Sequence, residues 1–104
     1  MNTKELKKMV KELREAHEQG VIQCKNAFWK GDACCAVGLV TLEVKEEQIS
    51  PSTYLQKRLY GFDVWEIPSV AKEYNSLWNL MVSMNDSGKN FAEIADAVEK
   101  QFLQ

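Results

Sequence analysis

The sequence has few of the residues that break regular structure or enrich disordered chains. Its 104 residues include two prolines and five glycines, against 45% hydrophobic residues, and contain no repeat or low-complexity tract. This composition argues against fibrous and disordered classes. A chain of this length folds as one domain, here residues 1–104, and buries roughly two-thirds of the surface that its unfolded form exposes. We therefore expect a single small domain with one core.

Cysteine and histidine are also scarce. The cysteines, Cys24, Cys34 and Cys35, are odd in number, and adjacent cysteines rarely bridge each other because the ring is strained. We therefore expect reduced thiols. Neither a C-x-x-C nor an H-E-x-x-H pattern occurs, although the three thiols and the single histidine, His17, would be adequate zinc ligands if they converged. We predict no metal site and no cofactor.

The chain lacks both a strong charge and a long apolar run. Thirteen Lys and Arg against fifteen Asp and Glu leave a net charge of −2, which creates no field that attracts phosphates. The N-terminal segment is rich in Lys and Glu and has no apolar signal region, and no run approaches the ~18 apolar residues of a membrane span. We expect no nucleic-acid partner, no membrane partner and a cytoplasmic location.

Helical spacing of the apolar residues predicts a mainly α fold, a compact bundle of about five helices. A first helix should begin at Asn2 or Thr3, since Asn2 and Glu5 form a capping-box pattern, and it should end near Gly20. The opposite face of this helix alternates basic and acidic residues and is expected to face solvent. Its buried face should contain Leu6, Met9, Val10, Leu13 and Ala16 or His17.

Residues 32–46 form the most apolar stretch, and we predict that they are the buried central helix. Asp32 is a residue type that caps helices, and Gly38 stands among small residues that suit close helix packing. Alternation of apolar and polar residues over 37–45 leaves a strand open as the alternative there. Length and the cap favour the helix, which the other helices would cover.

The second half of the chain predicts three more helices. The Ser50–Pro51 pair starts a short helix that should stop at Gly61, and residues 62–67 then form an extended crossing. A helix restarts at Ser69. A capping box at Asn90 begins the last helix, which should form an antiparallel hairpin with the one before it.

The sequence contains two groups of motifs, Gly31-x-x-Cys34-Cys35-Ala36-Val37-Gly38, and Asn85-Asp86-x-Gly88 followed by Asn90-Phe91-Ala92-Glu93-Ile94-Ala95-Asp96. They resemble those of an uncharacterised group of small phage and bacterial proteins, in which a glycine-rich C-x-x-G segment precedes a C-terminal Asn-Asp loop and a Phe-x-x-Ile/Val helix. The resemblance implies a compact helical fold and a phage or prophage origin, so that the cytoplasm would be that of the host. It carries no known activity and transfers no catalytic residue.

The adjacent thiols are the candidate catalytic groups. If Asp32 caps a helix, Cys34 and Cys35 occupy its first turn, where free N–H groups and the helix dipole lower a thiol pKa. His17 would be the accompanying base. The favoured alternative is that both cysteines are small buried residues that let a neighbouring helix approach.

The aromatic residues are the candidate binding groups. They offer more aromatic surface than so small a core must enclose, and Trp and Tyr commonly anchor interfaces. The alternative, that all of them lie in the core, stays open. The residues chosen as binding candidates are Trp29, Tyr60, Phe62 and Trp65, with Phe28 and Trp78 in the same aromatic set.

These patterns favour a small helical interaction protein that binds and modulates a host protein or pairs with itself as a homodimer. No acid/base pair, metal set or nucleotide loop is recognisable, which ranks binding before catalysis. A thiol-dependent enzyme or redox-sensitive regulator that uses Cys34 and Cys35 is the alternative. A small-ligand-binding oligomer is the third hypothesis.

Overall fold

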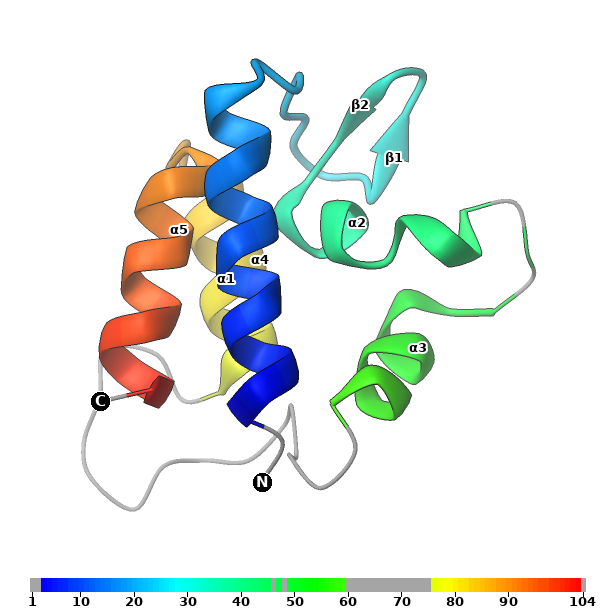
Figure 1. The fold of residues 1–104 in the computed structure, drawn as a ribbon. Coiled ribbons are helices and arrows are strands. Elements are labelled where there is room, and N and C mark those ends of the chain that lie inside the picture. The colour runs from blue at the N-terminus through cyan, green and yellow to red at the C-terminus, as the bar shows by residue number, and fades with distance from the viewer. Residues whose placement is uncertain (1–2, 46, 48, 60–75, 104) are drawn as a thin grey trace.

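The structure is a computed structural model that describes residues 3–45, 47, 49–59 and 76–103. Helices dominate these residues, and a single two-stranded sheet accompanies them (Figure 1). The predicted mainly α fold is confirmed. The elements are α1 (Thr3–Glu18), β1 (Trp29–Lys30), β2 (Ala33–Cys34), α2 (Ala36–Val40), the 3-10 helix η1 (Leu42–Val44), α3 (Pro51–Arg58), α4 (Leu77–Asp86), α5 (Phe91–Val98) and the π-helix η2 (Glu99–Leu103).

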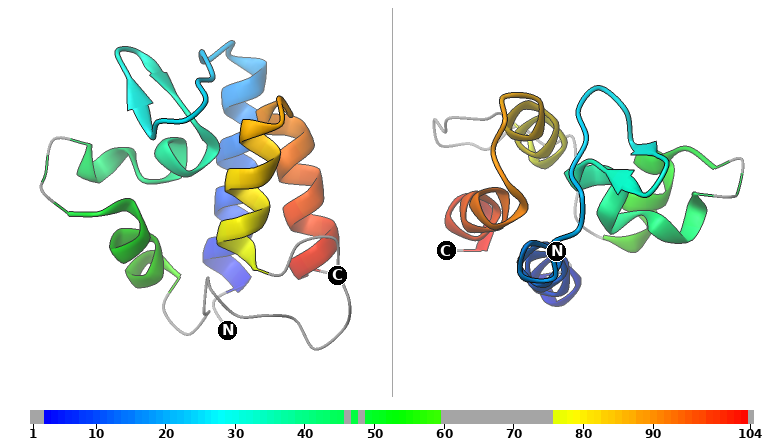
Figure 2. Two further views of the ribbon diagram at one scale, coloured as in Figure 1. Left: turned by 180° about the vertical axis from the view of Figure 1, so that it is seen from behind. Right: turned by 90° about the horizontal axis from the view of Figure 1, so that it is seen from above.

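The helices α1, α4 and α5 form the body of the molecule, and α5 packs against both α1 and α4. The small sheet, α2, η1 and α3 lie to one side of this bundle (Figure 2). The apolar face predicted for α1 is buried, with Leu6, Met9, Val10, Leu13 and Ala16 in the core, whereas His17, the alternative to Ala16, is exposed. The buried apolar residues of the other two helices are Leu77, Leu80, Met81 and Met84 of α4, and Phe91, Ile94, Ala95 and Val98 of α5.

The predicted end of α1 agrees with the structure, because the chain turns away at Gly20, whose φ of +73° is the left-handed conformation expected of a helix stop. Toward the N-terminus the helix extends to Thr3, the first described residue, and the predicted cap at Asn2 lies outside the described residues. Arg14 then joins α1 to the C-terminal segment, because its Nη2 lies 2.8 Å from Asp96 and its Nη1 lies 3.2 Å from Glu99.

Two predicted helix caps are confirmed. The Ser50 hydroxyl accepts a hydrogen bond from the N–H of Thr53 at 3.2 Å, at the start of α3. At the start of α5, the Asn90 side chain accepts from the N–H of Glu93 at 2.8 Å, while the Glu93 carboxylate accepts from the N–H of Asn90 at 3.1 Å. The N–H groups of Thr53 and Glu93 would otherwise lack a partner in the first turn of their helices.

Other predictions fall on parts of the chain that the structure does not describe. The stop at Gly61, the crossing at residues 62–67 and the helix start at Ser69 lie outside the described residues. In the described part, α4 is capped by Ser76, whose hydroxyl accepts a hydrogen bond from the N–H of Asn79 at 3.0 Å. The turn after α4 leads directly into α5, and the two helices pack together as the predicted hairpin.

The predicted central helix exists but is shorter than expected. Its start at Asp32 is wrong, because Gly31, with φ of +61°, turns the chain and Cys34 pairs with Trp29 across the small sheet. The helix α2 therefore begins only after Cys35, whose Sγ accepts a hydrogen bond from the N–H of Gly38 at 3.3 Å.

The central segment also ends early, at Thr41. The buried Thr41 hydroxyl donates a hydrogen bond to the carbonyl of Val37 at 2.8 Å, and the backbone leaves the α conformation before the 3-10 helix η1. Residues 36–40 are helical, so the strand alternative is wrong for them. Although short and placed beside the bundle, α2 is largely buried and contacts α1, α3 and α4.

Candidate functional site

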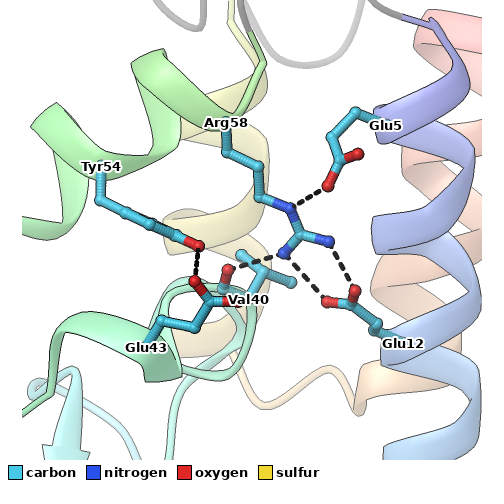
Figure 3. Close-up of polar contacts among 6 residues, drawn as sticks. All are labelled: Glu5, Glu12, Val40, Glu43, Tyr54 and Arg58. Atoms are coloured by element: carbon cyan, nitrogen blue, oxygen red, sulfur yellow. Dashed lines mark hydrogen bonds and ion pairs between the residues drawn. The ribbon is translucent and has the colours of Figure 1, made fainter.

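A polar groove of about 440 Å³ separates α1 from η1 and α3. Arg58, the last residue of α3, crosses it toward α1, while Tyr54 faces Glu43 on η1 (Figure 3). The charged residues that line this groove are Glu5, Lys8, Glu12, Glu15, Glu43 and Arg58.

The Arg58 guanidinium forms what we call the Arg58 clamp, with Glu5 and Glu12 of α1. Its Nε donates to Glu5 at 2.7 Å, and its two Nη atoms donate to the two oxygens of Glu12 (Figure 3). One Nη also donates to the carbonyl of Val40 at 2.8 Å. Burial opposes the positive charge, but hydrogen bonds to Glu12 and Glu5 outweigh it and raise the pKa of Arg58. The clamp therefore joins α3, α2 and α1 through one guanidinium that is hydrogen-bonded to two carboxylates.

Tyr54 makes a second link across the groove. Its hydroxyl donates to the Glu43 carboxylate at 2.7 Å, which connects α3 to η1. Burial and this hydrogen bond raise the pKa of Tyr54 to about 12, so the phenol is protonated at neutral pH. The polar side chains of the groove thus serve mainly to hold the elements around it together.

A second hollow, of about 370 Å³, lies between the loop at residues 26–28 and α4. Its walls are mostly apolar. The Phe28 and Trp78 rings meet edge to face, with centroids 6.0 Å apart and planes inclined by 63°. We call this hollow the aromatic pocket, and it is lined by Asn26, Ala27, Phe28, Cys35, Trp78, Val82, Asn85 and Asp86.

Asn85 fixes the loop side of the aromatic pocket to α4. Its Oδ1 accepts hydrogen bonds from the N–H of Ala36 at 3.0 Å and from the side chain of Gln23 at 2.7 Å. Its Nδ2 donates to the carbonyl of Cys24 at 2.8 Å. The side chain of this one residue, which is 1% exposed, therefore connects three segments of the chain. The sequence showed Asn85 only as part of a polar turn.

Gly38 fixes the position of Phe28. A Cβ at Gly38 would lie 1.9 Å from the carbonyl oxygen of Phe28, so α2 and the loop approach each other more closely than any side chain permits. Two hydrogen bonds hold this contact: the N–H of Cys35 donates to Phe28 O at 3.0 Å, and Trp29 Nε1 donates to Gly38 O at 2.9 Å. The aromatic wall of the pocket is therefore tied to the core.

The thiols occupy an environment that favours the neutral form. Cys34 and Cys35 are 3% and 7% exposed. Burial, with smaller contributions from Cys35 and Cys24, raises the pKa of Cys34 to about 11. Burial also raises the pKa of Cys35, although the hydrogen bond from Gly38 opposes this. Cys34 lies in β2 and Cys35 is the cap of α2, so the predicted place of both in a first helical turn is wrong.

The structure does not bring His17 to the thiols. Its side chain is exposed near the end of α1, and no hydrogen bond in the described part of the chain joins it to Cys34 or Cys35. The arrangement therefore provides neither a stabilised thiolate nor a base beside it.

The candidate binding residues are only partly described. Trp29 is half-buried on β1, behind Phe28, with ring centroids 5.9 Å apart, and it does not line the aromatic pocket. Among the aromatic set, Phe28 and Trp78 are the residues that the pocket brings together. Asp86 and Val82 also line the pocket. In the sequence, Asp86 stands out only as part of the Asn85-Asp86 motif. The other binding candidates, Tyr60, Phe62 and Trp65, lie outside the described residues.

The described residues contain neither a metal-binding group of side chains nor a membrane-spanning helix. No group of three or more His, Cys, Asp or Glu side chains in them is arranged to hold a metal ion. None of their helices combines the length and the apolar character needed to cross a membrane.

Comparisons with known proteins leave the site to be interpreted on its own geometry. No model of a known protein family matches the chain, and neither the curated proteins nor the solved structures include a match. The resemblance to small phage and bacterial proteins therefore stays a prediction.

Proposed function

We propose that this protein is a small helical interaction protein and that the aromatic pocket receives one side chain of a protein partner. The observation that carries the proposal is an apolar hollow with walls fixed to the core. Its volume of about 370 Å³ lies in the range of specific binding pockets, roughly 300–1,000 Å³. Preformed aromatic walls favour binding, because little conformational freedom is lost when a partner enters.

The aromatic pocket supports this function better than the polar groove does. Most of the groove's strongest polar groups already bind each other, since Arg58 joins Glu5 and Glu12 and Tyr54 joins Glu43. A ligand there would have to break these contacts. The aromatic pocket requires no such exchange.

The geometry also ranks binding before thiol chemistry. Burial keeps Cys34 and Cys35 protonated, and no hydrogen bond in the described part of the chain joins either thiol to His17. Thiol-dependent catalysis or redox regulation needs a reactive thiolate, which this environment disfavours.

We propose a host protein as the partner, and the cytoplasm of a bacterial host as the location if the chain is phage-encoded. Self-association is the alternative. The exposed large apolar side chains of the described residues, Ile22, Leu42 and Ile49, lie on three separate segments of the chain. Sedimentation of the purified protein at micromolar concentration tests the homodimer directly, and the predicted anchor Trp65 can be replaced by Ala in the same measurement.

The main experiment compares partner capture by two matched variants of the full chain. Ala27→Trp adds a large ring at an exposed position that lines the aromatic pocket, whereas Ile22→Trp adds the same ring at an exposed position on the same connection that does not. We expect wild type and Ile22→Trp to capture the same protein from host extract, and Ala27→Trp to lose it while unfolding at the same denaturant concentration. Equal capture by both variants contradicts a role for the pocket.

A further inference from the structure

We propose that the side chain which enters the aromatic pocket is an arginine of the partner. This inference rests on the proposed function and adds the chemical identity of the bound group. It follows from the charge of the pocket, the arrangement of its rings and the apolar residues beside them.

The pocket carries one charge. Among the described residues that line it, Asp86 is the only one with a formal charge at neutral pH, because the Cys35 thiol is protonated. Asp86 is exposed, and the one hydrogen bond that its carboxylate accepts from the described residues, from the N–H of Asn26 to Oδ1, is long at 3.4 Å. Its carboxylate therefore remains able to accept hydrogen bonds from a cation, which makes the pocket complementary to a positively charged group.

Lys25 forms no ion pair with Asp86 in the described part of the chain. Its Nζ lies 3.5 Å from the place where a Cβ would stand on Gly88, in the turn between α4 and α5. Lys25 does not line the aromatic pocket, so the pocket itself lacks a basic residue that would repel a cation or occupy Asp86.

The aromatic rings select the kind of cation. Phe28 and Trp78 offer ring faces and edges within one small space, and a guanidinium group stacks on such rings while it donates in its own plane to a carboxylate. The three methylene groups of arginine would contact the apolar wall at Val82 and Ala27. A lysine ammonium is a compact charge that cannot stack, so arginine fits this combination better.

The test uses short blocked peptides of the form Gly-Gly-Xaa-Gly-Gly, in which Xaa is arginine, citrulline or leucine. Citrulline has the shape of arginine without its charge. Titration into the full-length, isotopically labelled protein is followed by the NMR signals of the Trp78 indole N–H and the Asp86 amide. We expect the arginine peptide to shift both signals and to bind up to about 5-fold more tightly than the citrulline peptide, since an exposed ion pair contributes up to ~1 kcal/mol.

Two variants separate the charge of Asp86 from general electrostatics. Asp86→Asn should abolish the preference for arginine over citrulline, whereas Asp32→Asn, an exposed acid that does not line the pocket, should retain it. Equal binding of arginine and citrulline by the wild type, or tighter binding of leucine, overturns the arginine assignment and leaves the pocket as an apolar anchor site. If no peptide shifts the pocket signals while Ala27→Trp also captures the partner normally, the proposed function fails as well.

Discussion

The side-chain amide of Asn85 accepts a hydrogen bond from the backbone N–H of Ala36 at 3.0 Å, at the first residue of α2. The same amide donates to the carbonyl of Cys24, which belongs to a segment that pairs with Cys34 through a parallel bridge at Gln23. The amide thus occupies the place of the next hydrogen bond in that parallel pairing. A side chain of α4 extends a backbone ladder and so sets where α2 begins.

Replacement of Asn85 by Ala should therefore lower the free energy of unfolding by about 3 kcal/mol. The change leaves the N–H of Ala36 and the carbonyl of Cys24 without their partner, and each buried unsatisfied group costs roughly 1–3 kcal/mol. Chemical denaturation measures the loss. Gln19→Ala, at an exposed position, is the control and should change stability by less than ~0.5 kcal/mol. Similar stability of both variants would show that Asn85 makes no structural contribution.

Gly38→Ala should destabilise the protein by more than ~2 kcal/mol, because the new Cβ would meet a backbone carbonyl that cannot rotate away. The clash with Phe28 O, at 1.9 Å, requires the loop to move. Gly31→Ala is the matched control. Gly31 has a positive φ of +61° but open space around it, so its replacement should cost only the backbone strain, about 1 kcal/mol. Equal losses for the two variants would mean that the close approach at Gly38 is easily relaxed.

The features that could be predicted from the sequence are local ones. The caps at Ser50 and Asn90 depend on residues within three positions, and the buried face of α1 follows from helical spacing alone. The start of α2 could not be found in this way. Asp32 is a residue type that caps helices, but it follows the turn at Gly31. The backbone after it forms β2, where Cys34 pairs with Trp29, and so it cannot begin a helix.

The candidate site was less predictable than the fold, because its contacts join distant parts of the chain. Asn85 reaches Ala36 across 49 positions and Arg58 reaches Glu12 across 46. No periodic pattern encodes such pairs. Phe28 and Trp78 were recognisable as aromatic residues with a possible binding role, but their meeting beside Asp86 depends on how Asn85 and Gly38 position the loop.

The Arg58 clamp should give a measurable coupling energy between Arg58 and Glu12. A double-mutant cycle with Arg58→Met and Glu12→Gln is expected to yield a coupling energy of about 1–2 kcal/mol, because the ion pair is bidentate and the Arg58 side chain is 10% exposed. The exposed pair of Lys11 and Glu15, 3.7 Å apart, is the control and should couple by less than ~0.5 kcal/mol. Comparable values for the two pairs would reduce the clamp to an ordinary surface ion pair.

The buried thiol of Cys34 should make stability depend on pH in the alkaline range. Its pKa is about 11 in the folded protein, against an ordinary value of 9.0 that the unfolded chain is expected to retain, and burial is the main cause. The unfolded chain therefore loses this proton first as the pH rises. Stability that is fully present below pH 9 should fall between pH 9 and 11, since the folded state then binds more protons than the unfolded state.

Cys34→Ala isolates this effect from the tyrosines and lysines that titrate in the same range. The difference in free energy of unfolding between wild type and Cys34→Ala should stay constant below pH 9 and shift against the wild type as the pH approaches 11. Labelling by a disulfide reagent gives an independent measure, because reaction requires an accessible thiolate. At neutral pH the native Cys34 should react far more slowly than the same thiol in denaturant. Fast native labelling, or a pH-independent difference, would contradict the buried neutral thiol and would revive thiol chemistry as a function of this segment.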